Sequence, residues 1–200
     1  MQSFNPMQMH LLYRMFEYDE LTAFHCCRVA SMVMELCKIL EIPDHERELY
    51  FTAAALHDIG KMQVPQEIIA CKRKVTDTEL VEIKKHAQYG ESIAMSYGYR
   101  EEITKLIRGH HERLDGSGYP DKKCGYAVTF GMQVLGICDS MDAMLNERPY
   151  RERSLTIEEC KAELIKCSEK FSPTLTGETI KNMDAIVAAS YAGLPFGKHP

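Results

Sequence analysis

Two histidine-containing clusters, far apart in the sequence, place the strongest constraint on how this chain can fold. One is the pair His57-Asp58, and the other is the pair His110-His111. Imidazole and carboxylate groups bind divalent transition metals of intermediate hardness, such as Fe, Mn and Zn. Neighbouring helical positions point about 100° apart, so adjacent histidines reach one metal only from a helix end or a kinked last turn. We interpret the two clusters as halves of one polynuclear metal site, which the fold must bring together.

Five of the eight histidines fall on inward faces or at the ends of the helices that we predict below. A single inward histidine is more often a hydrogen-bonded core residue than a ligand. Several buried imidazoles beside an aspartate each need a partner, and their burial is costly unless they share a cation. This pattern therefore favours a metal site over an ordinary core. The five candidate ligands are His25, His57, His86, His110 and His111.

Three further polar residues are candidates for the same site. Asp139 interrupts an otherwise apolar helical run, so it needs a partner and is a natural further ligand. Asp142, one turn later, either fixes a ligand imidazole by accepting its other N–H or is a helix-surface carboxylate. Lys61 follows a glycine, and it either reaches back to hold a phosphate or is a surface lysine. Cys124 and Cys138 are nearby, but we expect buried thiols rather than zinc ligands there.

A short loop follows the second histidine pair and has its own signature. Gly116 and Gly118 permit positive φ angles, and Pro120 stiffens the exit from the loop. Alone, this segment from Asp115 onward predicts only a turn. Beside the metal residues, it supports the hypothesis that the loop around Tyr119 forms a substrate rim or docks a partner.

Composition limits the class of partner. The 200 residues are 45% hydrophobic and 26% charged, which is typical of one globular domain. A net charge of −5 argues against a nucleic acid polymer or an anionic membrane as a partner. We find no secretory segment or long apolar run, so we expect a cytoplasmic protein. In that setting the eight cysteines are expected to be free, mostly buried thiols.

Helical periodicity dominates the chain and predicts an all-α fold. The best-marked start is at Thr76, where Glu79 completes a capping box and Val75 and Leu80 form a hydrophobic staple. One long helix is expected from there, with Leu80, Ile83, Ala87, Gly90 and Ala94 as its buried stripe. Residues 62–75 are expected to be a loop with one helical turn at 65–70. The other predicted helices cover residues 21–42, 44–57, 100–110, 130–146, 157–170 and 175–191.

On these residues the chain resembles the HD-GYP domain, a subgroup of the HD superfamily of metal-dependent phosphohydrolases. His57-Asp58-Ile59-Gly60-Lys61 matches the HD-x-GK signature, and residues 110–120 match HHE-x-x-DG-x-GYP. The resemblance runs from about residue 21 to residue 184. It implies a single-domain helical bundle over residues 21–191, with residues 1–20 as a helical segment packed on the core and 192–200 as a tail.

The resemblance also implies two divalent metals, Fe or Mn, with Zn as the alternative. It assigns catalytic roles to Asp58, which bridges the metals, and to Lys61, which contacts a substrate phosphate together with Arg148 and Arg151. Some family members hold a third metal through a glutamate at the position of Leu21, which cannot coordinate, so we expect two. Arg73 and Lys74 stand where the family commonly has a Lys-Pro-Gly turn. The implied ligands are His25, His57, Asp58, His86, His110, His111 and Asp139.

The implied activity is hydrolysis of cyclic di-GMP to the linear dinucleotide, and on to GMP, by a hydroxide held between the metals. One alternative is an HD phosphohydrolase acting on another nucleotide, such as cyclic GMP-AMP or a mononucleotide. Another is a non-catalytic adaptor that docks a diguanylate cyclase through the Tyr119 loop, although the complete ligand set disfavours it. The chain length leaves no room for a sensory domain, so we expect regulation by a separate protein.

Overall fold

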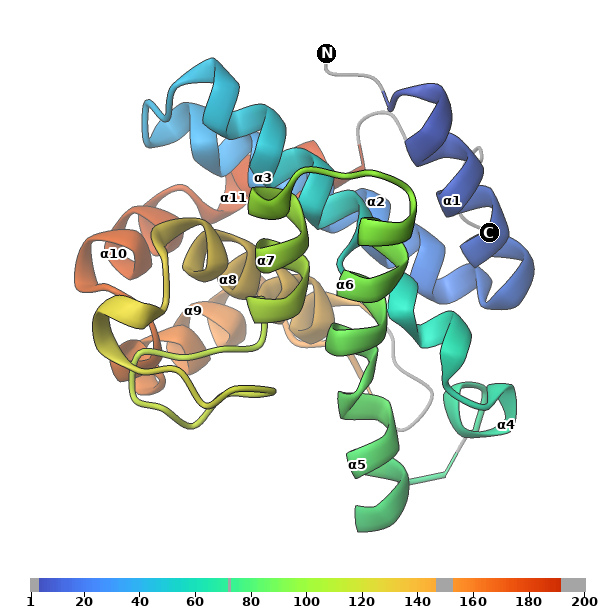
Figure 1. Ribbon diagram of the computed structural model, residues 1–200. Coiled ribbons are helices and arrows are strands. Elements are labelled where there is room, and N and C mark those ends of the chain that lie inside the picture. The colour runs from blue at the N-terminus through green and yellow to red at the C-terminus, as the bar shows by residue number, and fades with distance from the viewer. Residues whose placement is uncertain (1–3, 72, 147–152, 192–200) are drawn as a thin grey trace.

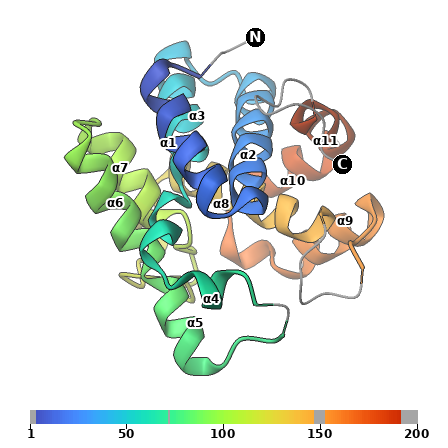
Figure 2. The same cartoon turned by 90° about the vertical axis from the view of Figure 1, so that its right-hand side faces the viewer.

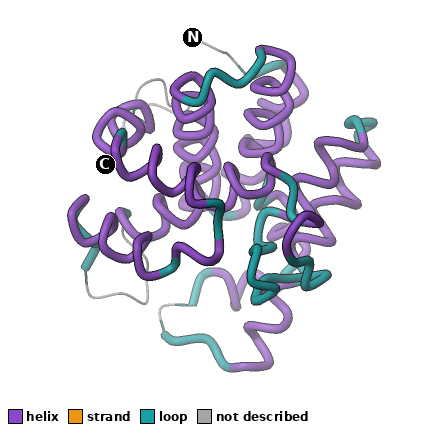
Figure 3. Tube along the Cα trace, turned by 90° about the vertical axis from the view of Figure 1, so that its left-hand side faces the viewer, coloured by secondary structure: helices purple, strands orange, loops and turns teal. Residues whose placement is uncertain are grey.

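The computed structural model describes residues 4–71, 73–146 and 153–191, and these residues form helices and loops without a β-strand (Figures 1 and 3). The predicted all-α class is therefore confirmed. Arg148 and Arg151 lie outside the described residues, as does the tail at 192–200. In chain order the elements are α1 Pro6–Tyr18, α2 Glu20–Ile39, α3 Asp44–Leu56, η1 Ile59–Gln63, α4 Gln66–Ile69, α5 Asp77–Lys84, α6 His86–Ser96, α7 Glu101–Gly109, η2 Gly125–Ala127, α8 Phe130–Leu145, α9 Ile157–Lys166, η3 Ser168–Lys170, α10 Pro173–Lys181 and α11 Met183–Ser190.

The long helix α2 is the centre of the packing. It contacts α1, α3, α8 and α11, and Figure 2 shows it beside α1 and α3. Val29, Met32 and Leu36 are fully buried in this core. The eight cysteines are free thiols, and five of them are buried. Cys138 is buried as predicted, but Cys124 is exposed, so its predicted burial was wrong. Because α2 is surrounded by other helices, a polar side chain in its middle must find its partner inside the protein.

The helix that was predicted to begin at Thr76 is two helices. The capping box is confirmed, because the Glu79 amide donates to Thr76 Oγ1 at 3.3 Å and the Thr76 amide donates to Glu79 Oε2 at 2.8 Å. The helix is interrupted at Lys85, between α5 and α6. Since α5 projects from the body of the molecule (Figures 1 and 2), Leu80 is 40% exposed, and its place in a buried stripe was predicted wrongly. Similar breaks separate α9 from η3 and α10 from α11.

Gly60 brings η1 into backbone contact with α6. A Cβ atom at this position would overlap the carbonyl oxygen of His86 and the amide nitrogen of Gly90. Only glycine permits this approach, because any side chain would force the two backbones apart. This contact sets the distance between Asp58, which lies just before η1, and His86, which begins α6. Both residues are predicted metal ligands.

We expect Gly60→Ala to destabilise the protein by about 1–3 kcal/mol or more, because backbone atoms cannot move aside as a flexible side chain can. Thermal unfolding should show a fall of about 2–4 °C for each kcal/mol. Gly177→Ala is the matched control. Nothing lies within 4 Å of a Cβ built on Gly177 inside α10, so alanine there should leave the melting temperature unchanged or raise it. Equal melting temperatures for Gly60→Ala and the wild type would contradict the argument.

Candidate metal centre

All seven predicted ligands come together, although they lie on different elements. His57 caps the C-terminus of α3, Asp58 precedes η1, and His86 begins α6. His110 caps the C-terminus of α7, so the adjacent pair His110-His111 stands at a helix end. The remaining two, His25 and Asp139, project from the interiors of α2 and α8. The predicted ligands therefore meet where helix ends abut the middle of two long helices.

Hydrogen bonds fix the orientation of four of the imidazoles. Three histidines at helix ends place Nδ1 against the carbonyl oxygen three residues earlier. These contacts are His57 Nδ1 to Ala54 O at 2.8 Å, His86 Nδ1 to Ile83 O at 2.6 Å, and His110 Nδ1 to Ile107 O at 2.6 Å. His25 instead places Nδ1 2.6 Å from Oδ2 of Asp142. A carbonyl or carboxylate can only accept, so each Nδ1 is the donor, and each Nε2 is the ring atom left to bind a proton or a cation in the site.

Asp58 lies between two groups of histidines. Its Oδ1 is 3.3 Å from Nε2 of His86, while its Oδ2 is 3.5 Å from Nε2 of His57 and 3.7 Å from Nε2 of His25. Asp139 also spans the cluster, with Oδ1 3.1 Å from Nε2 of His25. Three groups have ligand atoms within 4.8 Å of one another: His25, His57 and Asp58; His86, His110 and His111; and His57, His110 and Asp139.

The donor set fits divalent cations. The Nε2 atoms of His25 and His57 are 3.2 Å apart, and those of His86 and His110 are 3.3 Å apart. Two lone pairs at such distances repel each other unless a proton or a cation lies between them. Nitrogen ligands about 2.1 Å from one ion are separated by roughly 3.0–3.4 Å at octahedral or tetrahedral angles. Both pairs match that spacing.

The protonation states suit cation binding. Burial would raise the pKa of Asp58, but Lys61 and the surrounding imidazoles lower it well below its usual range. Burial lowers the pKa values of His110 and His111 far enough to keep both rings neutral. Burial also acts to lower the pKa of His57, yet Asp58 outweighs it and the pKa rises to about 9. A cation that binds Nε2 of His57 would therefore compete with a proton for that atom.

Lys61 and Asp142 both point inward. Nζ of Lys61 is 2.6 Å from Oδ2 of Asp58, with 15% of the lysine side chain exposed. Asp142 is fully buried rather than lying on the helix surface. An open cavity of about 300 Å³ leads to the cluster. Its lining consists of His25, Asp58, Lys61, Ile83, His86, His111, Arg113, Tyr119, Asp139, Ser140 and Ala143.

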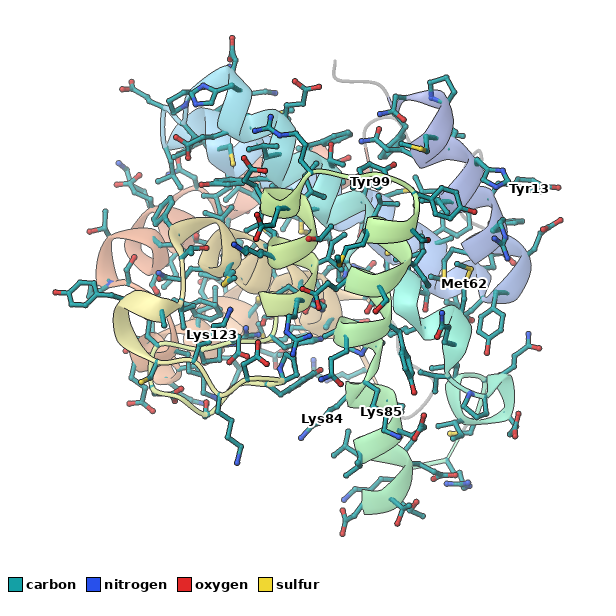
Figure 4. The ribbon with its side chains drawn as sticks, in the orientation of Figure 1. Tyr13, Met62, Lys84, Lys85, Tyr99 and Lys123 are labelled. Atoms are coloured by element: carbon teal, nitrogen blue, oxygen red, sulfur yellow. The ribbon has the colours of Figure 1, made fainter. Side chains whose placement is uncertain are left out.

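The loop between α7 and η2 folds back over the second histidine pair. A Cβ on Gly118 would lie 2.5 Å from the carbonyl oxygen of His111, which explains the second glycine of the loop. The ring of Tyr119 stacks on His111, with centroids 4.4 Å apart and planes at 25°. Lys84, at the end of α5 (Figure 4), lies over the Tyr119 ring at 5.2 Å. Tyr119 therefore covers the imidazole of one predicted ligand and forms part of the cavity wall.

Two residues near the site were missed by sequence reasoning. Glu112 is fully buried, and its two carboxylate oxygens accept hydrogen bonds from the amides of Asp121 at 2.7 Å and Lys123 at 2.8 Å. Glu112 therefore fixes the end of the loop at residues 121–123. The sequence signal that could have identified it is its position directly after His110-His111. Arg28 is also buried and pairs with Asp142. The sequence signal for Arg28 was its position three residues after His25, because residues at that spacing lie on one face of a helix.

Comparison with known proteins agrees with this architecture. The sequence profile of the HD domain matches residues 12–175. A cyclic di-GMP phosphodiesterase of Pseudomonas aeruginosa is 32% identical over 152 residues, which are 74% of this chain and 36% of that protein. The response regulator RpfG of Xanthomonas campestris, also a cyclic di-GMP phosphodiesterase, is 33% identical over 144 residues, 70% of this chain and 38% of its own length. The chain thus spans little more than a third of these relatives.

A third relative acts on another cyclic dinucleotide. The 3'3'-cGAMP-specific phosphodiesterase 3 of Vibrio cholerae is 35% identical over 130 residues, covering 65% of this chain and 28% of the relative. Among the described residues, no helix is both long and apolar enough to cross a membrane.

Solved structures agree at the level of the fold. The HD domain of the phosphodiesterase PgpH from L. monocytogenes, in complex with cyclic-di-AMP, superposes with a TM-score of 0.67 at 14% identity, covering 92% of this chain and 98% of that one. An HDG"Y"P protein from Bdellovibrio bacteriovorus gives 0.65 at 18% identity, covering 80% and 51%. Since the HD domain profile matches residues 12–175, a range that includes both histidine clusters, the chain belongs to the HD domain family, as its resemblance to the HD-GYP subgroup predicted.

Proposed function

We propose that this chain is a metal-dependent phosphodiesterase that hydrolyses cyclic di-GMP to the linear dinucleotide. The observation that carries the proposal is the position of Asp58, whose two oxygens face two separate histidine groups at the end of an open cavity. Such an arrangement suits a pair of cations that share one carboxylate. Relatives named as cyclic di-GMP phosphodiesterases support the choice of substrate.

His25, His57, Asp139 and Oδ2 of Asp58 would hold one cation, and His86, His110, His111 and Oδ1 of Asp58 the other. When bound, such ions stabilise charge on phosphoryl oxygens and lower the pKa of coordinated water. This mixed imidazole and carboxylate set favours Fe or Mn, with Zn as the alternative. The free thiols suit a reducing compartment, which supports a cytoplasmic location.

The remaining site residues would bind and orient the substrate. The Lys61 ammonium lies beside the bridging carboxylate, so it can bind a non-bridging phosphate oxygen next to the reacting phosphorus. Tyr119, stacked on His111, offers an aromatic rim for a planar base. We assign Arg148 and Arg151, outside the described residues, to further phosphate contacts. A diguanylate cyclase or other regulator would dock at the same loop, residues 115–120.

The test is a substrate panel on protein reconstituted anaerobically with Fe or Mn. We expect cyclic di-GMP to be converted to the linear dinucleotide, and mononucleotide monoesters to be left intact. If cyclic GMP-AMP is turned over faster than cyclic di-GMP, then cyclic GMP-AMP is the preferred substrate. The relative from Vibrio cholerae, named as 3'3'-cGAMP-specific, supports that alternative. A fully metallated protein that cleaves no nucleotide would refute the enzymatic proposal and leave the adaptor alternative.

A further inference from the structure

Arg28 forms a bidentate ion pair with Asp142, next to the candidate metal centre. Its Nε donates to Oδ1 of Asp142 at 2.7 Å, and its Nη2 donates to Oδ2 at 2.9 Å. Only 6% of Arg28 is exposed and Asp142 is fully buried, so water does not screen the pair. Oδ2 of Asp142 also accepts the Nδ1 hydrogen of His25 at 2.6 Å. One carboxylate therefore connects a buried arginine to a candidate metal ligand.

We infer that Arg28 is a positioning residue for His25 and acts through Asp142; this inference rests on the proposed function. The two oxygens of a carboxylate offer about four acceptor positions. Here Oδ1 accepts from Arg28 and from Nδ2 of Asn146 at 3.0 Å, while Oδ2 accepts from Arg28 and His25. The planar guanidinium holds the carboxylate in one orientation, which leaves a single acceptor direction for the imidazole.

The location of His25 explains why this ligand needs such a support. The other three oriented histidines stand at helix ends, where a backbone carbonyl three residues earlier can accept the Nδ1 hydrogen. His25 lies within α2, where the carbonyl groups of the preceding turn already accept helical hydrogen bonds. A side-chain acceptor from α8 takes their place. A carboxylate with no exposed surface needs a cation beside it, and Arg28 supplies that charge from the same face of α2.

The consequence concerns metal binding rather than substrate binding. With Nδ1 holding the hydrogen, Nε2 of His25 faces Asp139 at 3.1 Å and Asp58 at 3.7 Å. Without Arg28 the carboxylate of Asp142 can rotate, and the imidazole is free to turn or to change tautomer. We expect Arg28→Gln to lower the affinity for the cation held by His25, His57 and Asp58 by about 10- to 100-fold, which is typical when a group that orients a metal ligand is removed. The cation at His86, His110 and His111 should be retained.

The experiment is a titration of chelator-stripped protein with Mn²⁺ alone, without any nucleotide, on wild type, Arg28→Gln and Arg28→Lys. Lysine restores the positive charge but not the bidentate hydrogen bonding of the guanidinium, so Arg28→Lys should recover part of the lost Mn²⁺ affinity. Arg100→Gln is the matched control, because it makes the same substitution at an exposed arginine that pairs with Glu102 at 2.7 Å, and it should leave the Mn²⁺ affinity unchanged. Nitrogen NMR of the His25 ring adds a readout independent of stability: the Nδ1–H tautomer should dominate in the wild type and become mixed in Arg28→Gln.

A double variant separates positioning from simple destabilisation. If Arg28 acts through Asp142, then Arg28→Gln should have little further effect on Mn²⁺ affinity in an Asp142→Asn background. Additive effects, or an Arg28→Gln protein that binds two Mn²⁺ with wild-type affinity and tautomer, would overturn the inference. If Arg28→Gln does not fold, Arg28→Lys and Asp142→Asn provide the same comparison. A wild-type protein that binds Mn²⁺ but cleaves no cyclic dinucleotide would defeat the proposed function and leave this result intact.

Discussion

Asp58→Ala is expected to lose both metals and, with them, nearly all hydrolysis of cyclic di-GMP. Asp58 is the carboxylate that faces His86 with one oxygen and His25 and His57 with the other, so its removal weakens both halves of the centre. The loss of affinity should exceed the roughly 10- to 100-fold that follows removal of a group supporting a ligand. The fall in kcat/KM should be at least about 100- to 1,000-fold, since even one lost electrostatic contact to a transition state costs that much.

Elemental analysis after anaerobic reconstitution is the primary measurement. The wild type should hold about two transition metals per chain, the usual number for such hydrolytic sites, and Asp58→Ala fewer than one. Asp184→Ala serves as the control, because that side chain is 75% exposed and lies on α11, outside the cluster. Full metal content together with full activity in Asp58→Ala would show that the bridging role was assigned to the wrong residue.

Lys61→Ala should separate phosphate binding from metal assembly. Loss of a charge-assisted hydrogen bond to phosphate costs about 1.5–3 kcal/mol, so kcat/KM should fall roughly ten- to more than a hundredfold. Metal content should stay the same or rise slightly. The Lys61 ammonium lies 2.6 Å from Oδ2 of Asp58, so it competes with a cation for that oxygen and its removal does not hinder binding.

Steady-state kinetics on metal-loaded protein, with metal content measured in parallel, tests this expectation. Lys61→Arg should recover only part of the efficiency, because a planar fork does not reproduce a compact ammonium. Lys105→Ala is the control, since Lys105 is exposed on α7 and pairs with Glu101 at 2.7 Å. If Lys61→Ala keeps wild-type efficiency with its metals in place, Lys61 has no role in phosphate binding.

Features that depend on neighbours along the chain could be predicted from the sequence. The Thr76–Glu79 capping box involves residues three positions apart, and it is present as expected. The same holds for the helix end at His110-His111, where the adjacent histidines gain freedom to point in a common direction. The candidate ligands were also predictable, because burying several imidazoles beside a carboxylate costs free energy unless a shared cation offsets it.

Other features depend on residues that are distant in sequence. Whether Leu80 is buried depends on what packs against α5, and this helix projects from the body of the molecule. Arg28 meets a carboxylate 114 positions later, and no local periodicity predicts that pairing. The burial of Glu112 likewise depends on the loop closing over it through two backbone amides. The Thr76 capping box and the helix end at His110 depend on hydrogen bonds between residues close in sequence, so the sequence alone determined them. The break in the helix and the partner of each buried charge were decided by tertiary packing, because only the folded chain brings those groups together.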